Sequence, residues 1–266
     1  MTTFTISKDG TKIAYSQTGT GEPLVLVDGA FCHGKFGANK KLPQHLSQHF
    51  TVYSYDRRGK GESGNTLPYS VEKEYEDLQA VIHEAGGNAY VYGISSGAAL
   101  VLEAANHGVI IKKMALYEAP FITDNSRKPL PENYFDTITN MVEQGNNGKA
   151  LEHFFKTGIE VPAFGVLMMK LMPAWNQMKK LAPTLIYDNK ILGDTGSGKS
   201  FGKGKWKNVT QPALILSGSK SAAWSQSSMQ HLATVLRNAT YRSLTGQTHI
   251  VNPKILAQEL IDFFKS

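Results

Sequence analysis

Residues 89–106, AYVYGISSGAALVLEAAN, decide the fold. Ala89 to Ile94 is a continuous apolar run, as expected of a strand buried on both faces. Ala98 to Asn106 has the spacing of a helix. Residues 93–97, GISSG, join the two as G-x-S-x-G, the sharp strand-to-helix turn that exposes a serine hydroxyl, here that of Ser95. A glycine-rich turn that merely contains a serine is the alternative.

Apolar runs alternate with amphipathic stretches over much of the remaining chain. This alternation predicts an α/β fold, in which a mostly parallel twisted sheet is flanked by crossover helices. Asp9-Gly10 between two alternating runs predicts an opening hairpin. The expected strands are Phe4 to Ser7, Lys12 to Gln17, Leu24 to Asp28, Thr51 to Tyr55, Ala89 to Ile94, Lys113 to Tyr117, Ala213 to Ser217 and Tyr241 to Leu244. The expected helices are Val71 to Ala85, Ala98 to Asn106, Ser225 to Leu236 and Lys254 to Phe264.

Residues 119–208 break this rhythm, since the interval is far longer than a crossover connection needs. We expect a helical cap inserted there after the sixth strand, with residues 1–118 and 209–266 forming the core domain. Its methionines suit either an adaptable apolar pocket wall or the packing of the cap itself. They are Met168, Met169, Met172 and Met178. The expected cap helices are Pro131 to Gln144, Lys149 to Thr157, Pro162 to Met172 and Ala174 to Tyr187.

Composition excludes several classes of protein. The 266 residues are 41% hydrophobic and 19% charged, which is ordinary for a globular protein and unlike a disordered or coiled-coil chain. The net charge of +6 comes without a nucleic-acid-binding motif, so we expect no nucleic-acid partner. Neither a leader segment nor a membrane-length apolar run is visible, and the single cysteine, Cys32, allows no internal disulfide. We therefore expect a cytoplasmic protein that is not membrane-bound, and we read Cys32 as a small buried hydrophobe.

Four motifs occur in the order typical of one enzyme family. Residues 28–31, DGAF, follow the third strand where that family usually has His-Gly-x, and residues 56–63, DRRGKGES, match D-x-R-G-x-G-x-S after the fourth. The GISSG turn and residues 246–249, GQTH, complete the set. The chain resembles the α/β-hydrolase family over nearly its whole length outside residues 119–208. Asp28 departs from the family's histidine, and we expect it to hydrogen-bond locally or to pair with a basic neighbour such as Arg57.

The resemblance implies a nucleophile and a base. A serine hydroxyl needs a base to take its proton, and an imidazole does so near neutral pH. Ser95 is the expected nucleophile, and His249 is the expected base because it lies in the loop after the last strand. The other histidines suit surface or packing roles, although His33 lies near the expected oxyanion loop.

The acid that orients the histidine departs from the common family pattern. Most members place it after the strand here assigned to Ala213 to Ser217, but residues 218–221 read GSKS and hold no carboxylate. Some members, including dehalogenases, use an acid after the preceding strand, where this chain has Glu118. We therefore predict Glu118 as the third triad member. A carboxylate that caps the first turn of the cap is the alternative role.

The resemblance also implies an oxyanion hole and a reaction. Backbone N–H groups of Ser96 and, by analogy, Ala30 are expected to hold the substrate oxygen. The predicted activity is hydrolysis of a small or medium carboxylic ester or lactone through an acyl-enzyme, without a cofactor or metal. The substrate is expected to be a small molecule with an apolar part. Its expected contacts are Phe31, Met168 and Met172.

Two alternative functions remain. Serine-dependent relatives that cleave carbon-carbon bonds or make peracids share this set of residues. A ligand-binding module with negligible turnover, as in hormone receptors of this fold, is favoured by the missing carboxylate in residues 218–221. The oligomeric state is not readable from the sequence.

Residues 193–200 match a phosphate-binding motif, but the residues around them do not fit such a loop. Residues 193–200, GDTGSGKS, satisfy the phosphate-binding pattern G-x-x-x-x-G-K-[ST]. That loop needs a buried strand before it and a helix after it, yet the glycine-rich residues 201–205, FGKGK, follow. We predict a flexible segment, whose lysines between Lys199 and Lys207 form a solvated rim or weakly attract anions.

Overall fold

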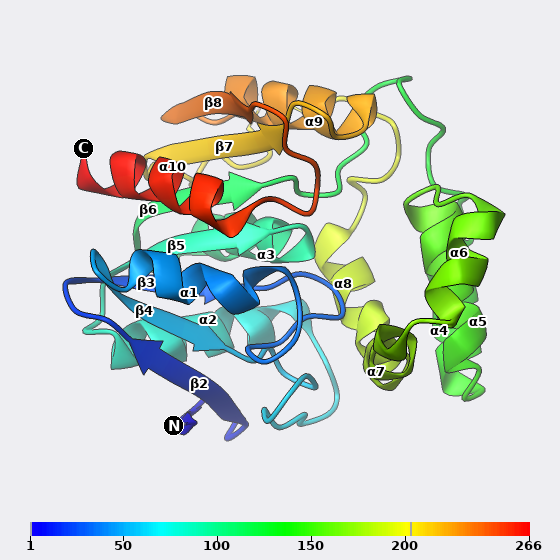
Figure 1. Ribbon diagram of the computed structural model, residues 1–266, viewed down its shortest axis with the longest axis horizontal. Helices are drawn as coiled ribbons and strands as arrows, with labels where there is room; N and C mark the ends of the chain where they lie inside the picture. Colours follow the sequence, from blue (N-terminus) through cyan, green and yellow to red (C-terminus); the bar gives the residue numbers. More distant parts are fainter. Residues whose placement is uncertain (1, 203) are drawn as a thin grey trace.

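The computed structural model describes residues 2–202 and 204–266, and in them a single eight-stranded sheet carries the fold (Figure 1). The strand order is β1-β2-β4-β3-β5-β6-β7-β8; β1 and β4 pair with β2 antiparallel, and all other pairs are parallel. The predicted α/β fold and opening hairpin are therefore confirmed. The strands are β1 (Thr3–Ile6), β2 (Lys12–Thr18), β3 (Glu22–Val27), β4 (Phe50–Tyr55), β5 (Ala89–Ile94), β6 (Ile111–Tyr117), β7 (Ala213–Gly218) and β8 (Ala239–Leu244).

Helices cover both faces of the sheet because the central strands are apolar on both faces. In β3, Leu24 and Leu26 join one apolar cluster, whereas Val25 and Val27 join the other, as the two-residue period of a strand requires. The first cluster includes residues of α1 (Leu42–Leu46) and α10 (Pro253–Lys265). The second includes residues of α2 (Val71–Glu84), α3 (Ser96–Asn106) and α9 (Ala223–Val235).

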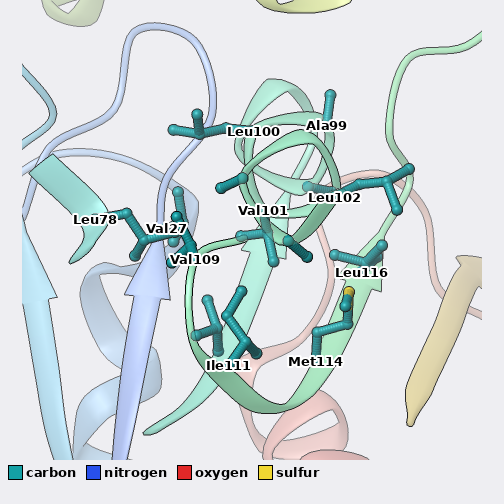
Figure 2. Close-up of a cluster of buried hydrophobic side chains, with 14 of the residues drawn as sticks. Val27, Leu78, Ala99, Leu100, Val101, Leu102, Val109, Ile111, Met114 and Leu116 are labelled. Atoms are coloured by element: carbon teal, nitrogen blue, oxygen red, sulfur yellow. The ribbon is translucent and has the colours of Figure 1, made fainter. Parts of the chain in front are cut away.

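Helix α3 is the most deeply buried of these elements. Figure 2 shows Leu100, Val101 and Leu102 of α3 in one apolar cluster with Val27 and Leu116 of the sheet. All five side chains are buried, so truncation of one leucine to alanine is expected to cost about 2–5 kcal/mol of stability. This packing fixes the start of α3, and with it the GISSG turn, on the sheet.

The residues between β6 and β7 form a separate group of helices. Figure 1 shows the arrowheads of β5, β6 and β7 pointing toward the side on which these helices lie. Their apolar side chains form a third cluster, which includes Tyr134, Ile138, Phe155, Trp175 and, from the loop after β3, Phe31. The helices are α4 (Tyr134–Glu143), α5 (Asn147–His153), α6 (Ala163–Lys170), α7 (Pro173–Leu181) and α8 (Leu185–Leu192), with a π turn at Phe154–Gly158.

One predicted helix of this group is wrong in detail. The chain does not run as a single helix from Ala174 to Tyr187, but as α7, a 3-10 turn at Ala182–Thr184, and α8. Pro183 lies in the turn and has no N–H to donate to the preceding turn of helix. The interruption gives α8 its own start, and residues of α8 lie next to α3.

Candidate active site

The GISSG turn holds Ser95 in a strained conformation between β5 and α3. Ser95 has φ 57° and ψ −129°, a region that non-glycine residues rarely occupy and that costs about 1–3 kcal/mol. The flanking glycines are required by contact: a Cβ on Gly97 would lie 2.4 Å from the Val27 carbonyl oxygen, and one on Gly93 would lie 2.6 Å from that of Gly97. The Ser95 N–H donates to the Tyr117 carbonyl (2.9 Å), which ties the turn to the end of β6.

The loop after β3 passes directly against this serine. A Cβ on Gly29 would lie 2.9 Å from the Ser95 Cβ and 3.4 Å from its Oγ. The next residue, Ala30, makes no hydrogen bond through its N–H to any described residue. Ser96 is the first residue of α3, where an N–H has no acceptor within the helix. The two amides proposed for the oxyanion hole therefore belong to segments that border Ser95.

Glu118 and His249 are in direct contact. Glu118 Oε2 lies 2.8 Å from His249 Nδ1, and Glu118 Oε1 accepts a hydrogen bond from the Gly218 N–H (2.7 Å). The glutamate is buried, at 2% exposure, whereas the imidazole is about half exposed. Tyr117 Oη donates to the Thr248 carbonyl (2.7 Å) and so holds the loop that carries the histidine. The contact with Glu118 orients the imidazole through Nδ1, and the bond from Tyr117 fixes the backbone next to His249.

The ends of neighbouring strands explain how Glu118 reaches the end of β7. Glu118 follows β6, which pairs with β7, so its carboxylate reaches the backbone at the end of β7. There Gly218 supplies only an N–H, and a Cβ at that position would lie 2.4 Å from the Gln247 carbonyl oxygen. Glu118 itself has φ 45°. It does not cap the first helix of the segment that follows, because α4 begins at Tyr134.

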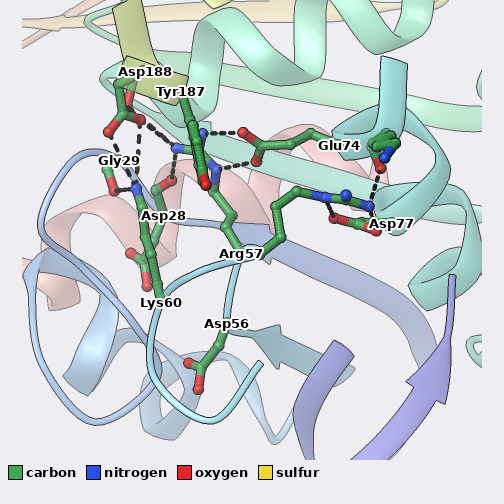
Figure 3. Close-up of polar contacts among 12 residues, drawn as sticks. Asp28, Gly29, Asp56, Arg57, Lys60, Glu74, Asp77, Tyr187 and Asp188 are labelled. Atoms are coloured by element: carbon green, nitrogen blue, oxygen red, sulfur yellow. Dashed lines mark hydrogen bonds and ion pairs between the residues drawn. The ribbon is translucent and has the colours of Figure 1, made fainter. Parts of the chain in front are cut away.

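A buried group of charges lies beside the candidate oxyanion loop (Figure 3). Arg57 makes a bidentate contact with Glu74 (2.7 and 2.8 Å) and donates to Asp188 Oδ1 (2.7 Å). Asp188 also accepts from Ser96 Oγ (2.7 Å) and lies 3.3 Å from Lys60 Nζ. Burial alone would raise the pKa of Asp188, but Lys60 and Arg57 outweigh it and hold that pKa below its ordinary value.

Two members of this group, Glu74 and Asp188, were not expected from the sequence. Arg57 and Lys60 belong to the DRRGKGES motif, but no sequence signal pointed to Glu74 on α2 or to Asp188 on α8. The contacts of Asp188 with Ser96 and Arg57 join residues more than ninety positions apart, whereas Glu74 is 17 positions from Arg57. The placement of α8 against α3 brings Asp188 to this group.

The sequence suggested that Asp28 hydrogen-bonds locally or pairs with a basic neighbour such as Arg57. The structure shows no ion pair between the Asp28 carboxylate and Arg57. Arg57 Nη1 instead donates to the Asp28 backbone carbonyl (3.3 Å). The carboxylate is buried, and its Oδ1 has no hydrogen-bond partner among the described residues. Burial raises the pKa of Asp28 to about 7, although the nearby charge of Lys60 acts in the opposite direction.

The three residues expected to contact substrate lie in different surroundings. Phe31 has φ 58° and is buried, with its ring edge-on to Phe154 (5.1 Å between centroids) and stacked on Phe155 (5.9 Å). Met168 and Met172, on and just after α6, are 48% and 55% exposed. The partly buried methionines that pack on the aromatic cluster are Met169 and Met178.

The second motif lacks the context that phosphate binding requires. Residues 193–200 follow a helix, α8, rather than a strand, and the described residues between them and β7 form no helix. The expected context, without a strand before the motif or a helix after it, is therefore confirmed for the described residues. Residue 203 of the lysine-rich stretch lies outside the described residues.

The part of the chain that the structure describes has no group of three or more His, Cys, Asp or Glu side chains that could hold a metal ion. It also has no helix that is long and apolar enough to cross a membrane.

Comparison with known proteins identifies the family. The sequence profile of the alpha/beta hydrolase family matches residues 30–256. A solved alpha/beta hydrolase from Sphaerobacter thermophilus is 40% identical, covers 98% of this chain and 100% of its own, and superposes with a TM-score of 0.91. The chain belongs to the alpha/beta hydrolase family.

Two solved structures of lower identity share the fold. A bromoperoxidase from Bacillus anthracis is 20% identical with a TM-score of 0.72, and the two chains cover each other completely. An esterase from Thermogutta terrifontis is 18% identical with a TM-score of 0.69, covering 100% of this chain and 98% of its own. The uncharacterized hydrolase YraK of Bacillus subtilis is 34% identical over 105 residues, a match that spans 37% of each protein.

Proposed function

We propose that this protein is a serine hydrolase that cleaves a small or medium carboxylic ester or lactone through an acyl-enzyme on Ser95. The observation that carries the proposal is the 2.8 Å contact between Glu118 and His249, next to a strand end that presents Ser95 in the strained turn. The esterase of similar fold is consistent with ester chemistry. The helices α4 to α8 are proposed to act as a cap that selects the substrate.

The proposed reaction has two half-reactions, formation and hydrolysis of the acyl-enzyme, and both use the same groups. The Ser95 oxygen attacks the ester carbonyl carbon while His249 Nε2 takes the hydroxyl proton. Glu118 holds Nδ1–H, which keeps Nε2 free as the base and stabilises the imidazolium. The amides of Ala30 and Ser96 bind the oxyanion. The imidazolium then protonates the leaving alcohol, and a water molecule, activated in the same way, releases the acid and restores Ser95.

The contact of Glu118 with His249 also bears on the alternative of a ligand-binding module. That alternative depended on the lack of a carboxylate in residues 218–221. A carboxylate from the end of β6 is available to the imidazole instead, so the absence after β7 no longer favours a binding function.

Labelling with a fluorophosphonate tests the nucleophile without knowledge of the substrate. We expect one adduct by intact mass on the wild-type protein and none on Ser95→Ala. A folded wild-type protein that forms no adduct, and yet binds ligands without product, would overturn the proposal in favour of the binding module. An adduct without turnover on any ester or lactone would instead favour carbon-carbon bond cleavage or peracid formation.

Turnover of the Glu118→Gln variant tests the acid. Loss of the carboxylate leaves the imidazole without its partner, and kcat is expected to fall by about 10²- to 10⁴-fold. Glu259→Gln is the matched control, because Glu259 pairs with Arg242 on the surface away from the site. Activity of Glu118→Gln within a few-fold of that control would mean that Glu118 is not the acid.

A further inference from the structure

Lys60 is a fully buried cation next to the loop that passes Ser95. Its side chain has no exposure, which is rare for a lysine unless the charge is paired. The D-x-R-G-x-G-x-S motif leaves this position open, so the motif assigns Lys60 no role. Its Nζ lies 3.1 Å from the Gly29 carbonyl oxygen and 3.4 and 3.3 Å from the two carboxylate oxygens of Asp188. Three acceptors match the three N–H donors of an ammonium group.

The acceptor on Gly29 is the other end of the peptide group that carries the Ala30 N–H. A trans peptide is planar, and its C=O and N–H point in opposite directions. A donor that holds the Gly29 oxygen therefore fixes the direction of the Ala30 N–H. The cationic donor also draws electron density toward the carbonyl oxygen, which makes the N–H of the same peptide a stronger donor.

A second buried cation holds the preceding peptide. Arg57 Nη1 donates to the Asp28 carbonyl oxygen (3.3 Å). Figure 3 shows both cations meeting Asp188, which comes from α8. The same carboxylate accepts from Ser96 Oγ. One carboxylate thus holds side chains next to both amides of the proposed oxyanion hole.

We propose that Lys60 is a positioning residue for the oxyanion hole: its buried ammonium, held by Asp188, orients and polarises the Gly29–Ala30 peptide so that the Ala30 N–H meets the developing oxyanion. This inference rests on the proposed hydrolase function. Lys60 does not touch the substrate and exchanges no proton with it. Its effect is confined to steps in which negative charge develops on the carbonyl oxygen.

The test compares Lys60→Met with Arg58→Met. Methionine keeps an unbranched apolar chain and removes the ammonium. Arg58 is the matched control because it is equally buried and ion-paired, but its partners, Asp9 and Asp77, lie outside the oxyanion loop. Hydrolysis of p-nitrophenyl acetate is measured per active serine, counted by saturating fluorophosphonate label, so that loss of folded protein does not register as loss of rate.

Weakening one oxyanion donor should lower kcat by about 10- to 100-fold, less than the loss of a whole donor, and should leave KM nearly unchanged. Arg58→Met should keep the wild-type kcat per labelled serine. The intermediate variant Lys60→Gln retains an N–H donor for the Gly29 oxygen, so it should recover part of the lost rate. If Lys60→Met does not fold, Lys60→Gln is compared with the wild type in its place.

A thionoester analogue separates this role from general damage to the site. Sulfur accepts hydrogen bonds poorly, so an oxyanion hole favours the oxygen ester, and a weakened hole should lower the ratio of ester to thionoester kcat/KM. The ratio should fall in Lys60→Met and stay at the wild-type value in Arg58→Met. An unchanged kcat or an unchanged ratio in Lys60→Met overturns the role of Lys60 alone. Absence of any label on wild-type Ser95 overturns the proposed hydrolase function, and this inference with it.

Discussion

Two consecutive arginines make a natural comparison within this molecule. Arg57 and Arg58 follow β4, are both almost wholly buried, and each forms a bidentate pair with a carboxylate on α2. Arg57 takes Glu74, and Arg58 takes Asp77, one turn further along that helix. By residue type, burial and primary partner, the two are nearly equivalent.

Their second partners differ completely. Arg57 reaches Asp188 on α8 and lies 3.4 Å from Ser96 Oγ at the start of α3. Arg58 reaches Asp9 in the opening hairpin (3.0 Å). One arginine connects the candidate active site to the helices between β6 and β7, and the other connects the N-terminal hairpin to α2. A buried ion pair therefore says little about function until the remaining donors of the cation are traced.

Of the two arginines, Arg57 should cause the larger loss of stability and activity when it is replaced. Arg57→Met leaves Glu74 and Asp188 buried with one cation fewer, and breaking a buried pair costs about 3–5 kcal/mol. We also expect a lower kcat per labelled serine, since the Asp28 carbonyl and Asp188 lose a donor. Urea unfolding and p-nitrophenyl acetate hydrolysis measure the two effects. If Arg57→Met were as stable as the wild-type protein, the ion pairs of Arg57 with Glu74 and Asp188 would be dispensable for stability.

Replacing Arg58 should cost somewhat less stability and no catalysis. Its partner Asp77 is buried, but Asp9 is partly exposed, so water can solvate one of the two carboxylates left behind. Arg58→Met is therefore expected near the lower end of the cost of breaking a buried pair, about 3 kcal/mol. A drop in kcat per labelled serine equal to that of Arg57→Met would remove the functional distinction between the two arginines.

The third prediction concerns the pH dependence of stability through Asp28, whose carbonyl Arg57 holds. Burial raises the pKa of its carboxyl from 3.8 to about 7, so the folded protein binds a proton that the unfolded chain releases. Stability from this group is present below pH 4 and is lost as the pH rises from about 4 to about 7. Asp28→Asn should flatten the pH dependence of unfolding in that window, and Asp136→Asn, on the exposed side of α4, should not. An identical slope in both variants would show that Asp28 titrates normally.

The strands could be predicted because their signal is local. Ala89–Ile94 is a continuous apolar run, and Ala213–Gly218 is apolar except for Ser217, as a strand buried on both faces requires. The short helix α1 was not predicted, since five residues carry too little periodicity. The break between α7 and α8 was also missed, although Pro183 marks it in the sequence. The helical pattern continues on both sides of Pro183, so the loss of one backbone N–H was not recognised as a break.

The sequence by itself determined the strands, the turn at Ser95 and the family motifs, because each of these depends on residues adjacent in the chain. The absence of a carboxylate in residues 218–221 also made Glu118 the candidate for the acid. Only the tertiary structure brought Glu118 against His249 and set Lys60, Arg57 and Asp188 beside the oxyanion loop. A buried charge is stable only where an opposite charge meets it, and that meeting depends on how distant elements pack.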